Sequence, residues 1–300
     1  MRILVIGSGL IGSVYAARLT TGGHQVTVLA RGPRLVRLQA DGIRLEDARS
    51  GVSTIVAVTA TATISPDADH DLVIVTVRAE QIAQTLPLVL SLTSEPDVLF
   101  FGNIADEGES INAALGAQAF FGFPGIGGVL ADGIARFVLV DQQKTVVGEI
   151  SRRSSPRVAR VRDAFESAGF PTAVCWNMPE WLTAHAAFIA PIAIALSKCG
   201  GDPTLLAGDR RALATMVSTT RQFYKALRSE GNTAIPANLW LLYSRLPSAF
   251  AISYWRRVMR DGRGELWFGA HCRAAPAETA AMLHHLTREW QLVSAQPLPS

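Results

Sequence analysis

Three glycines near the start of the chain have the spacing of a phosphate-binding loop. Residues 2–6 have strand character, Gly7, Gly9 and Gly12 follow with the spacing G-x-G-x-x-G, and an amphipathic helix is expected over residues 13–19. In this arrangement the first glycine makes the tight turn, the second lets a pyrophosphate approach the backbone, and the third lets helix and strand pack closely. Free amides at the helix start would face the phosphates. The motif predicts a dinucleotide site, and the alternative is a purely structural turn.

The residue after the second strand predicts which dinucleotide binds. Residues 25–30 have the pattern of that strand, and the chain continues as Arg31-Gly32-Pro33-Arg34 without an acidic residue. At this position an acidic side chain binds the adenosine 2′-hydroxyl of NAD, whereas an arginine accepts the 2′-phosphate of NADP. Arg31 therefore favours NADP over NAD. The alternative is a solvated arginine on a loop.

Two more polar residues follow buried strands. Residues 71–77 and 98–101 are apolar runs typical of a parallel sheet, Arg78 follows the first run, and Asn103 follows the second. Ligands of open parallel sheets bind at the carboxyl ends of the strands. Both residues are therefore candidates for the cofactor site, and the alternative for each is a turn residue.

Strands and helices alternate in the first half of the chain, which predicts a doubly wound α/β sheet. Gly22 and Gly23 should end the first helix. The further elements expected here are a strand pair with a turn, a strand-like run, a helix capped by Ser154-Ser155-Pro156 and a last strand, at residues 42–59, 118–150, 156–168 and 171–175. Arg157 and Arg160 on that helix are interpreted as a solvated basic surface. The first domain should comprise residues 1–177.

The second half, residues 178–300, is expected to be an all-helical domain. Its predicted helices cover residues 179–198, 209–230, 236–243, 249–260, 266–273 and 277–290. The longest apolar run, residues 186–196, is too short to span a bilayer and contains Pro191, so it predicts a buried helix and no membrane partner.

Composition excludes several classes of protein. The chain has 300 residues, of which 49% are hydrophobic and 18% charged, so it can bury the cores of two domains. A net charge of +3 is too small to favour nucleic acid binding. Cys175, Cys199 and Cys272 lie far apart without metal-ligand spacing, which predicts reduced thiols, no metal and a cytoplasmic protein. Met1 leads directly into the first strand, so no signal peptide is expected.

The order of these motifs resembles the ketopantoate reductase (2-dehydropantoate 2-reductase) family. The resemblance rests on the glycine-rich turn, Arg31, the segment Arg78-Ala79-Glu80-Gln81 and Asn103, and it extends over essentially the whole chain. It implies a Rossmann-type sheet domain followed by a helical domain, with the reaction site between them. The cofactor-binding residues that it implies are Gly7, Ser8, Gly9, Leu10, Ile11, Gly12, Arg31, Arg78 and Asn103, and Asn103 is also a catalytic candidate. In this chain Arg78 stands where the family has lysine, and Ile104 replaces the glycine after Asn103.

The catalytic segments of the family are only partly matched. Aligned on Trp181, the family's lysine, its presumed proton donor, falls on Thr183, and the family's asparagine positions fall on alanine or proline. Further along, Ser253 and Glu265 keep the twelve-residue separation of the family's substrate-binding serine and catalytic glutamate. The alternatives are an incidental helix residue for Ser253 and a helix-start carboxylate for Glu265.

Another group would have to donate a proton to the substrate. His185 has a suitable ordinary pKa, and Glu265 could serve if burial raised its own. However, two residues along a helix turn His185 about 200° from Thr183, which favours a structural histidine in the core. Thr183 could relay a proton but is a poor acid. Lys198 would lie about 22 Å away along the helix.

These observations predict an NADP(H)-dependent oxidoreductase of the ketopantoate reductase type. It would transfer hydride between the nicotinamide and a small carbonyl or hydroxyl substrate that is less polar than ketopantoate. The alternative is a sensor or scaffold that binds NADP(H) without catalysis, although Ser253 and Glu265 argue against it. The related 3-hydroxyacid dehydrogenases fit the Arg78 and Glu265 segments less well. A homodimer is a further expectation.

Overall fold

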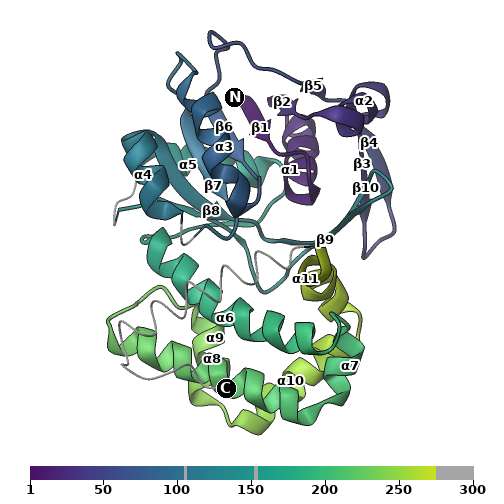
Figure 1. Ribbon diagram of the computed structural model, residues 1–300, viewed down its shortest axis with the longest axis vertical. Helices are drawn as coiled ribbons and strands as arrows, with labels where there is room; N and C mark the ends of the chain where they lie inside the picture. The colour runs from purple at the N-terminus through teal and green to yellow at the C-terminus, as the bar shows by residue number, and fades with distance from the viewer. Residues whose placement is uncertain (105–106, 152–154, 275–300) are drawn as a thin grey trace. The chain divides into compact units, whose positions relative to one another are not determined.

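The computed structural model describes residues 1–104, 107–151 and 155–274, which form two compact units (Figure 1). Contacts divide the chain into Met1–Met178 and Pro179–Ser300. The boundary expected from the sequence, after residue 177, lies one residue before this division. The first unit contains both sheets, and the second contains only helices in its described residues.

The first unit follows the expected alternation of strands and helices. Its strands are β1 (Arg2–Ile6), β2 (Gln25–Leu29), β3 (Ile43–Asp47), β4 (Ser53–Val56), β5 (Thr59–Thr61), β6 (Leu72–Val75), β7 (Asp97–Phe101), β8 (Ala119–Phe123), β9 (Ile126–Ala131), β10 (Ile134–Leu139), β11 (Thr145–Gly148) and β12 (Thr172–Val174). Its α-helices are α1 (Leu10–Thr21), α2 (Gly32–Asp41), α3 (Ala79–Leu90), α4 (Gly108–Leu115) and α5 (Pro156–Ser167), and the 3₁₀ turn Gly116–Gln118 follows α4.

The large sheet has the strand order β12-β11-β8-β7-β6-β1-β2-β5. Every neighbouring pair in it is parallel except β11 and β8, so the doubly wound, mostly parallel sheet is confirmed. The chain passes from β1 to β2 on one side of β1 and later returns to β6 on its other side. In open α/β sheets, ligands bind at such a reversal of strand order, outside the carboxyl ends of the strands. Here the reversal lies between β1 and β6.

Helix α1 is buried between two sheets. A second sheet, of order β4-β3-β10-β9, packs on the face of α1 that is turned away from the large sheet. As a result every residue from Gly12 to Ala17 is buried. The expectation of an amphipathic helix was therefore wrong, because the strand pair over residues 42–59 extends a sheet that covers the outer face of this helix. That pair, β3 and β4, is antiparallel, as expected.

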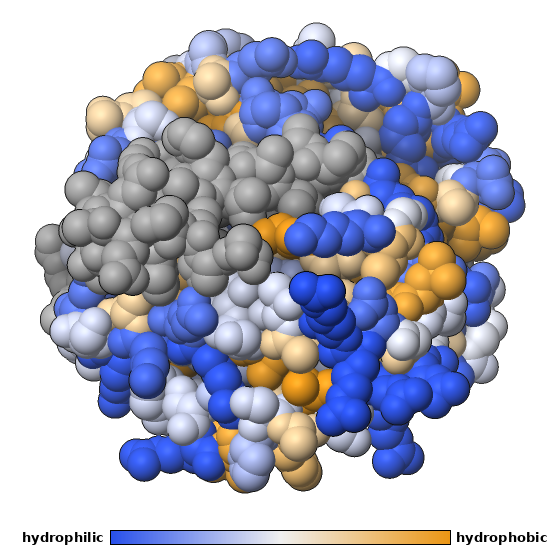
Figure 2. Space-filling model, turned by 60° about the horizontal axis from the view of Figure 1, so that its bottom comes forward, coloured by the Kyte–Doolittle hydropathy of each residue, from blue (hydrophilic) through white to orange (hydrophobic). Residues whose placement is uncertain are grey.

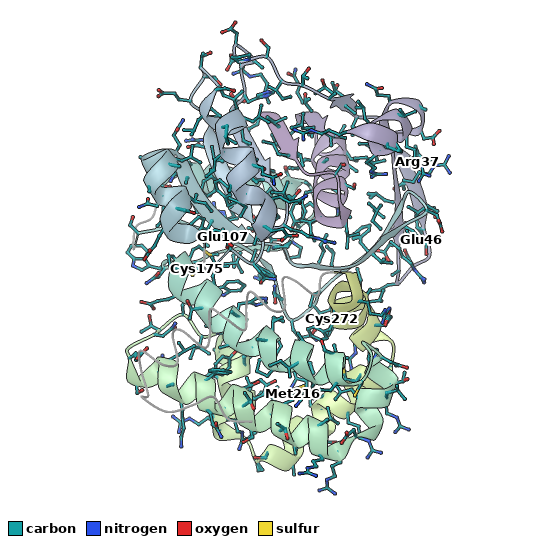
Figure 3. The ribbon with its side chains drawn as sticks, in the orientation of Figure 1. Arg37, Glu46, Glu107, Cys175, Met216 and Cys272 are labelled. Atoms are coloured by element: carbon teal, nitrogen blue, oxygen red, sulfur yellow. The ribbon has the colours of Figure 1, made fainter. Side chains whose placement is uncertain are left out.

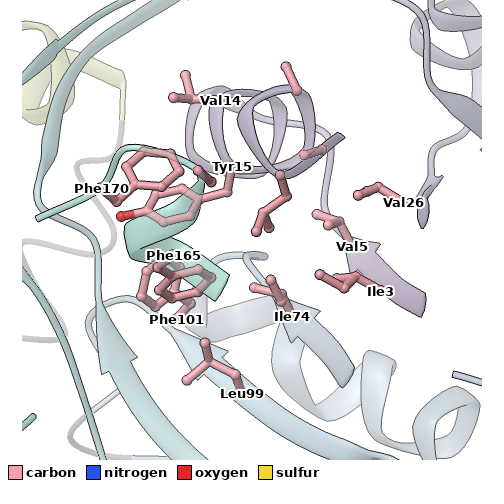
Figure 4. Packing of buried hydrophobic residues seen from close by; sticks show 14 of the residues in the cluster. Ile3, Val5, Val14, Tyr15, Val26, Ile74, Leu99, Phe101, Phe165 and Phe170 are labelled. Carbon is pink, nitrogen blue, oxygen red and sulfur yellow. The ribbon is translucent and has the colours of Figure 1, made fainter. Parts of the chain in front are cut away.

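Tyr15 of α1 is at the centre of an aromatic cluster in this core (Figure 4). Its ring stacks on Phe170 at a centroid distance of 4.0 Å and meets the edge of Phe101 at 4.7 Å. Its hydroxyl oxygen lies 2.6 Å from Oγ1 of Thr145, the first residue of β11. Burial raises the pKa of Tyr15, so the group is a neutral hydrogen-bonding partner. The contacts join α1 to β7, β11 and the segment before β12.

Two helices of the first unit were not expected from the sequence. The segment 31–34, interpreted as a loop, instead begins helix α2, in which Pro33 occupies the first turn and Gly42 follows the last residue. Only Leu38 of this helix is buried, so its buried apolar face is narrow. Helix α4 was also missed.

The second unit is helical, as expected. Its elements are α6 (Met178–Lys198), α7 (Pro203–Gly208), α8 (Arg210–Ser229), α9 (Ala237–Trp240), a π-helical turn (Leu241–Arg245), α10 (Ser248–Arg260), a second π-helical turn (Glu265–Gly269) and α11 (Ala270–Ala274). Helix α7 was not expected, and the helix predicted over residues 277–290 lies outside the described residues. The core gathers around Phe188 of α6, whose ring lies 5.6 Å from Trp255 and 6.4 Å from Phe268.

Helix α6 contains the long apolar run at 186–196. With 21 residues it is long and apolar enough to span a membrane, yet 72% of its most apolar stretch is buried within the structure. It therefore has the character of a core helix. Large apolar side chains of this unit that are exposed, Leu205, Leu241 and Phe250, lie on three different elements. On the face shown in Figure 2, hydrophilic side chains predominate and apolar ones lie scattered between them.

Arg157 at the start of α5 is buried in an ion pair, so the expected solvated surface was wrong for this residue. Its side chain is 13% exposed and its Nε donates to Oε1 of Glu149 at 2.7 Å. It also donates to the carbonyls of Gln118 and Ala119, each at 3.0 Å. Burial lowers the pKa of Arg157, but the hydrogen bonds and charge of Glu149 outweigh this effect and raise it. Arg160 is 57% exposed, in agreement with the expectation.

We predict that Arg157→Met lowers the free energy of unfolding by about 3 kcal/mol, because it leaves the carboxylate of Glu149 buried without its partner. Arg160→Met is the matched control, since it removes an exposed arginine that pairs with Asp97 at 2.9 Å and should cost about 1 kcal/mol or less. Urea unfolding of both variants measures the difference. Equal costs for the two variants would contradict the role assigned to Arg157.

Candidate active site

The glycine-rich turn connects the carboxyl end of β1 to α1. Gly7 has a φ of +109°, a conformation that side-chain-bearing residues rarely adopt. A Cβ on Gly12 would lie 1.8 Å from the carbonyl oxygen of Gly7, so only glycine allows α1 to approach the strand this closely. A Cβ on Gly9 would meet no atom within 4 Å. The backbone is therefore open at Gly9, at the start of α1, where a phosphate group would fit.

Thr76 holds this turn in place. It follows β6, and its Oγ1 donates to the carbonyl oxygen of Gly7 at 2.9 Å, while its backbone amide donates to Ile6 at 2.8 Å. Thr76 was not among the residues expected from the sequence. The available signal was its position, because it is a polar residue at the carboxyl end of a buried strand next to β1.

The register of the large sheet brings the other candidates of the first unit to the same edge. Ile6 pairs with Val75, and Val75 pairs with Phe100, so the carboxyl ends of β1, β6 and β7 are level. Arg78 precedes α3, where its backbone amide donates to Oε1 of Gln81 at 3.3 Å, and its side chain is exposed. Asn103 follows β7 by two residues.

The residue after Asn103 departs from the family pattern in a way that the structure accommodates. Ile104 is 2% exposed, so its side chain joins the core of the first unit. An apolar contact has therefore replaced the backbone freedom of glycine at this position.

Arg31 and Arg34 differ although they are separated by one helical turn. Arg31 is the residue that precedes α2; it is exposed, and its side chain makes no hydrogen bond or ion pair to the residues that the structure describes. Arg34 is partly buried and bonds to the glycine-rich turn: its Nη2 donates to Oγ of Ser13 at 2.7 Å, and its Nε donates to the carbonyl oxygen of Ser8 at 3.2 Å. Arg34 could not be singled out from the sequence as Arg31 was, because the contacts of Arg34 depend on the unexpected helix α2.

The second unit carries the remaining candidates, and two of them lie on α6. The hydroxyl of Thr183 donates to the carbonyl oxygen of Pro179 at 3.1 Å, so its proton is used within the helix. His185 is 5% exposed, and its ring stacks on Trp181 with a centroid distance of 5.0 Å and an interplanar angle of 9°. The packing of His185 is what a structural histidine would show.

Ser253 and Glu265 lie on α10 and on the second π-helical turn. Ser253 is exposed. The side chain of Glu265 is 44% exposed and forms an ion pair with Arg273, whose Nη1 also donates to the carbonyl oxygen of Gly201 at 2.7 Å. Within the described part of the chain, no hydrogen bond joins Thr183, Ser253 and Glu265 to one another. π-helical turns occur often at functional sites, and this one carries Glu265.

No cluster of three or more His, Cys, Asp or Glu side chains that could hold a metal is found among the described residues. Cys175, Cys199 and Cys272 are all free thiols. The described residues thus bring together an open backbone turn in the first unit, and they place a hydroxyl and a carboxylate, Ser253 and Glu265, in the second.

The sheet order, the glycine-rich turn and the helical second unit define a Rossmann-type sheet domain followed by a helical domain, and dinucleotides bind to sheets of this type. The family model described as Ketopantoate reductase PanE/ApbA matches residues 3–152, and the chain belongs to this family. The resemblance seen in the sequence is thereby confirmed.

Individual proteins of known sequence or structure are also similar to this chain. The 2-dehydropantoate 2-reductase of Pyrococcus horikoshii is 26% identical over 182 residues, which are 60% of this chain and 58% of that protein. The match thus spans less than two thirds of that relative. The structure of 2-dehydropantoate 2-reductase from Methylococcus capsulatus has a TM-score of 0.71 at 18% identity, covering 99% of this chain and 92% of that one. A complex of D-mandelate dehydrogenase with NADH has a TM-score of 0.73 at 13% identity, covering 97% and 92%. Both structures share the fold.

Two alanine substitutions separate the structural from the binding role of the turn. We predict that Gly12→Ala destabilises the first unit by about 1–3 kcal/mol or more, since its Cβ would overlap the backbone of Gly7. Gly9→Ala should leave stability unchanged but weaken dinucleotide binding, because its Cβ occupies only the open space at the start of α1. Thermal unfolding with and without NADPH measures both effects. Undiminished stabilisation of Gly9→Ala by NADPH would place the cofactor elsewhere.

Proposed function

We propose that this protein is an oxidoreductase that transfers hydride between NADP(H) and a small carbonyl or hydroxyl substrate. The observation that carries the proposal is the open backbone at Gly9, at the start of α1 and beside the reversal of strand order between β1 and β6. Membership of the ketopantoate reductase family supports it, as does the NADH named in the D-mandelate dehydrogenase complex. When bound, NADPH would supply the hydride.

The choice of NADP over NAD rests on Arg31. Its guanidinium is exposed and makes no hydrogen bond to the described residues, so it can bind a 2′-phosphate without breaking an existing contact. The amino end of α2 lies directly after it and favours negative charge as well. No acidic residue stands at the end of β2 to bind a free 2′-hydroxyl.

The substrate should be less polar than ketopantoate. Thr183 stands at the family's lysine position and uses its hydroxyl proton within α6. The family's asparagine positions on this helix fall on alanine or proline, and Ala184 and Ala187 are packed in the core of the second unit. The side chains on this part of α6 thus offer little to bind a highly polar molecule.

The remaining roles are assigned by position and exposure. We assign substrate binding to Ser253, an exposed hydroxyl, and a catalytic role to Glu265, whose carboxylate remains half-exposed beside Arg273. Asn103 would orient the nicotinamide end of the cofactor at the carboxyl end of β7. His185 is a weaker candidate for proton transfer, because it is buried against Trp181.

A second candidate function is an NADP(H)-binding sensor or scaffold without catalysis. The observation that favours it is Thr183, which replaces a proton donor with a hydroxyl that is already engaged. Turnover distinguishes the two: an enzyme consumes NADPH with some member of a panel of small 2-oxo acids, ketones and aldehydes, whereas a sensor binds NADPH and consumes it with none.

For the proposed oxidoreductase we further propose a cytoplasmic location and a homodimer. The location is supported by Cys175, Cys199 and Cys272, which form no disulfide among the described residues.

For cofactor choice, we predict that Arg31→Ala weakens NADPH binding roughly tenfold to a hundredfold, which corresponds to the loss of a charge-assisted hydrogen bond. NADH binding should stay unchanged, because NADH has no 2′-phosphate. Isothermal titration with both cofactors measures the two affinities, and Arg37→Ala on the same helix is the control. An equal loss for NADH would show that Arg31 does not recognise the 2′-phosphate.

For catalysis, we predict that Glu265→Gln lowers kcat/KM by roughly 10²-fold or more while the affinity for NADPH is retained. Asp261→Asn is the matched control, since Asp261 is a carboxylate of similar exposure, 38%, that pairs with Arg263. The measurement is NADPH oxidation with the best substrate of the panel. Wild-type turnover by Glu265→Gln would remove Glu265 from the mechanism.

A further inference from the structure

We propose that Arg34 is a positioning residue of the glycine-rich turn, which orients the Gly9 amide toward the pyrophosphate of the dinucleotide. The proposal rests on the proposed NADP(H) binding. It gives Arg34 a role different from that of Arg31, which is proposed to select NADP over NAD. Arg34 lies on α2, three residues after Arg31. It is not part of the glycine motif, but its side chain contacts that motif.

The contacts of Arg34 join three segments of the first unit. Nε donates to the carbonyl oxygen of Ser8 at 3.2 Å, Nη2 donates to Oγ of Ser13 at 2.7 Å, and Nη1 lies 3.5 Å from the carbonyl oxygen of Gly133. Ser13 in turn donates its hydroxyl proton to the same Ser8 carbonyl at 3.2 Å. Two donors therefore converge on one carbonyl oxygen inside the glycine motif.

The orientation of the Ser8 carbonyl also fixes the orientation of the Gly9 amide. A trans peptide is planar, so the carbonyl of Ser8 and the amide N–H of Gly9 point in opposite directions. By holding the Ser8 carbonyl on the side of α2, Arg34 and Ser13 direct the Gly9 amide to the other side. A Cβ on Gly9 would meet no atom within 4 Å, so the backbone there is open to a ligand.

The charge of Arg34 acts in the same direction. Burial lowers the pKa of Arg34, and the neighbouring charge of Arg37 lowers it further, yet an arginine remains charged at neutral pH. The guanidinium of Arg34, which is bonded to the Ser8 carbonyl oxygen, polarises the Ser8–Gly9 peptide, and its positive charge attracts phosphate. Arg37 lies on the same helix and projects outward (Figure 3), with no hydrogen bond to the turn among the described residues.

The two arginines should therefore differ in what they recognise. The 2′-phosphate is present only in NADP(H), whereas the pyrophosphate is common to NADP(H) and NAD(H). A residue that binds the 2′-phosphate affects one cofactor, and a residue that orients the Gly9 amide affects both. Arg34 is committed to the turn by its hydrogen bonds, so it belongs to the second kind.

The test compares the affinities of the intact protein for NADPH and NADH by isothermal titration. We expect Arg34→Ala to weaken both about tenfold, with their ratio unchanged, and Arg34→Lys to recover part of the loss. Arg37→Ala should change neither affinity. Ser13→Ala, which removes the second donor to the Ser8 carbonyl, should also weaken both cofactors and keeps the test valid if Arg34→Ala does not fold.

The outcomes are distinct. Wild-type affinities in Arg34→Ala and Ser13→Ala, or a loss confined to NADPH, would overturn the positioning role while leaving the proposed function standing. If the wild-type protein binds neither dinucleotide, the proposed function fails and this proposal fails with it. A merely structural role would lower the melting temperature of Arg34→Ala without changing either affinity of the folded protein, and that result also overturns the proposal.

Discussion

The close approach of α1 to the carboxyl end of β1 is the constraint on which the first unit depends. A side chain at position 12 would overlap the carbonyl of Gly7, so glycine there sets the distance between helix and sheet. That distance allows Thr76 to bond the turn, and it places the first amides of α1 at the carboxyl end of β1, next to β6 in the sheet. Because two sheets cover α1, the helix cannot shift without disturbing its packing against both of them. The glycine-rich turn is therefore anchored by a helix whose residues from Gly12 to Ala17 are all buried.

Three arginines of the first unit show that the role of a cation depends on its partners. Arg157 is a buried structural charge that is paired with Glu149, Arg34 bonds to the glycine-rich turn, and Arg31 remains available to a ligand. Desolvation makes an unpaired buried charge costly, so the first two are held by several acceptors. Only an arginine without such acceptors can bind a phosphate without losing existing contacts.

The strands, the domain types and the glycine-rich turn could be predicted because they leave local patterns. β1 was predicted to the residue, and the cap of α5 by Ser155 was expected from sequence alone. Helix α2 and the burial of Arg157 could not be predicted, since the first has a narrow apolar face and the second depends on Glu149 and on distant carbonyls. The same holds for the ion pair of Glu265 with Arg273, which packs beside Gly201 of another segment. The spacing of residues along the chain cannot predict a role that depends on contacts with residues far away in the sequence.

The two units differ in how their chemistry can change during divergence. The proposed phosphate binding at the glycine-rich turn would use backbone amides, which every residue type except proline supplies, so it would persist as long as the conformation persists. The proposed proton transfer in the second unit would use side chains, so a single substitution, such as threonine for the family's lysine at position 183, could change it while the helix is kept. The hydroxyl of Thr183 bonds back to Pro179 within α6, so the threonine is accommodated in the helix with its donor satisfied. A protein of this architecture can therefore keep its cofactor and exchange its substrate, which is how a family member can carry the turn without the family's lysine.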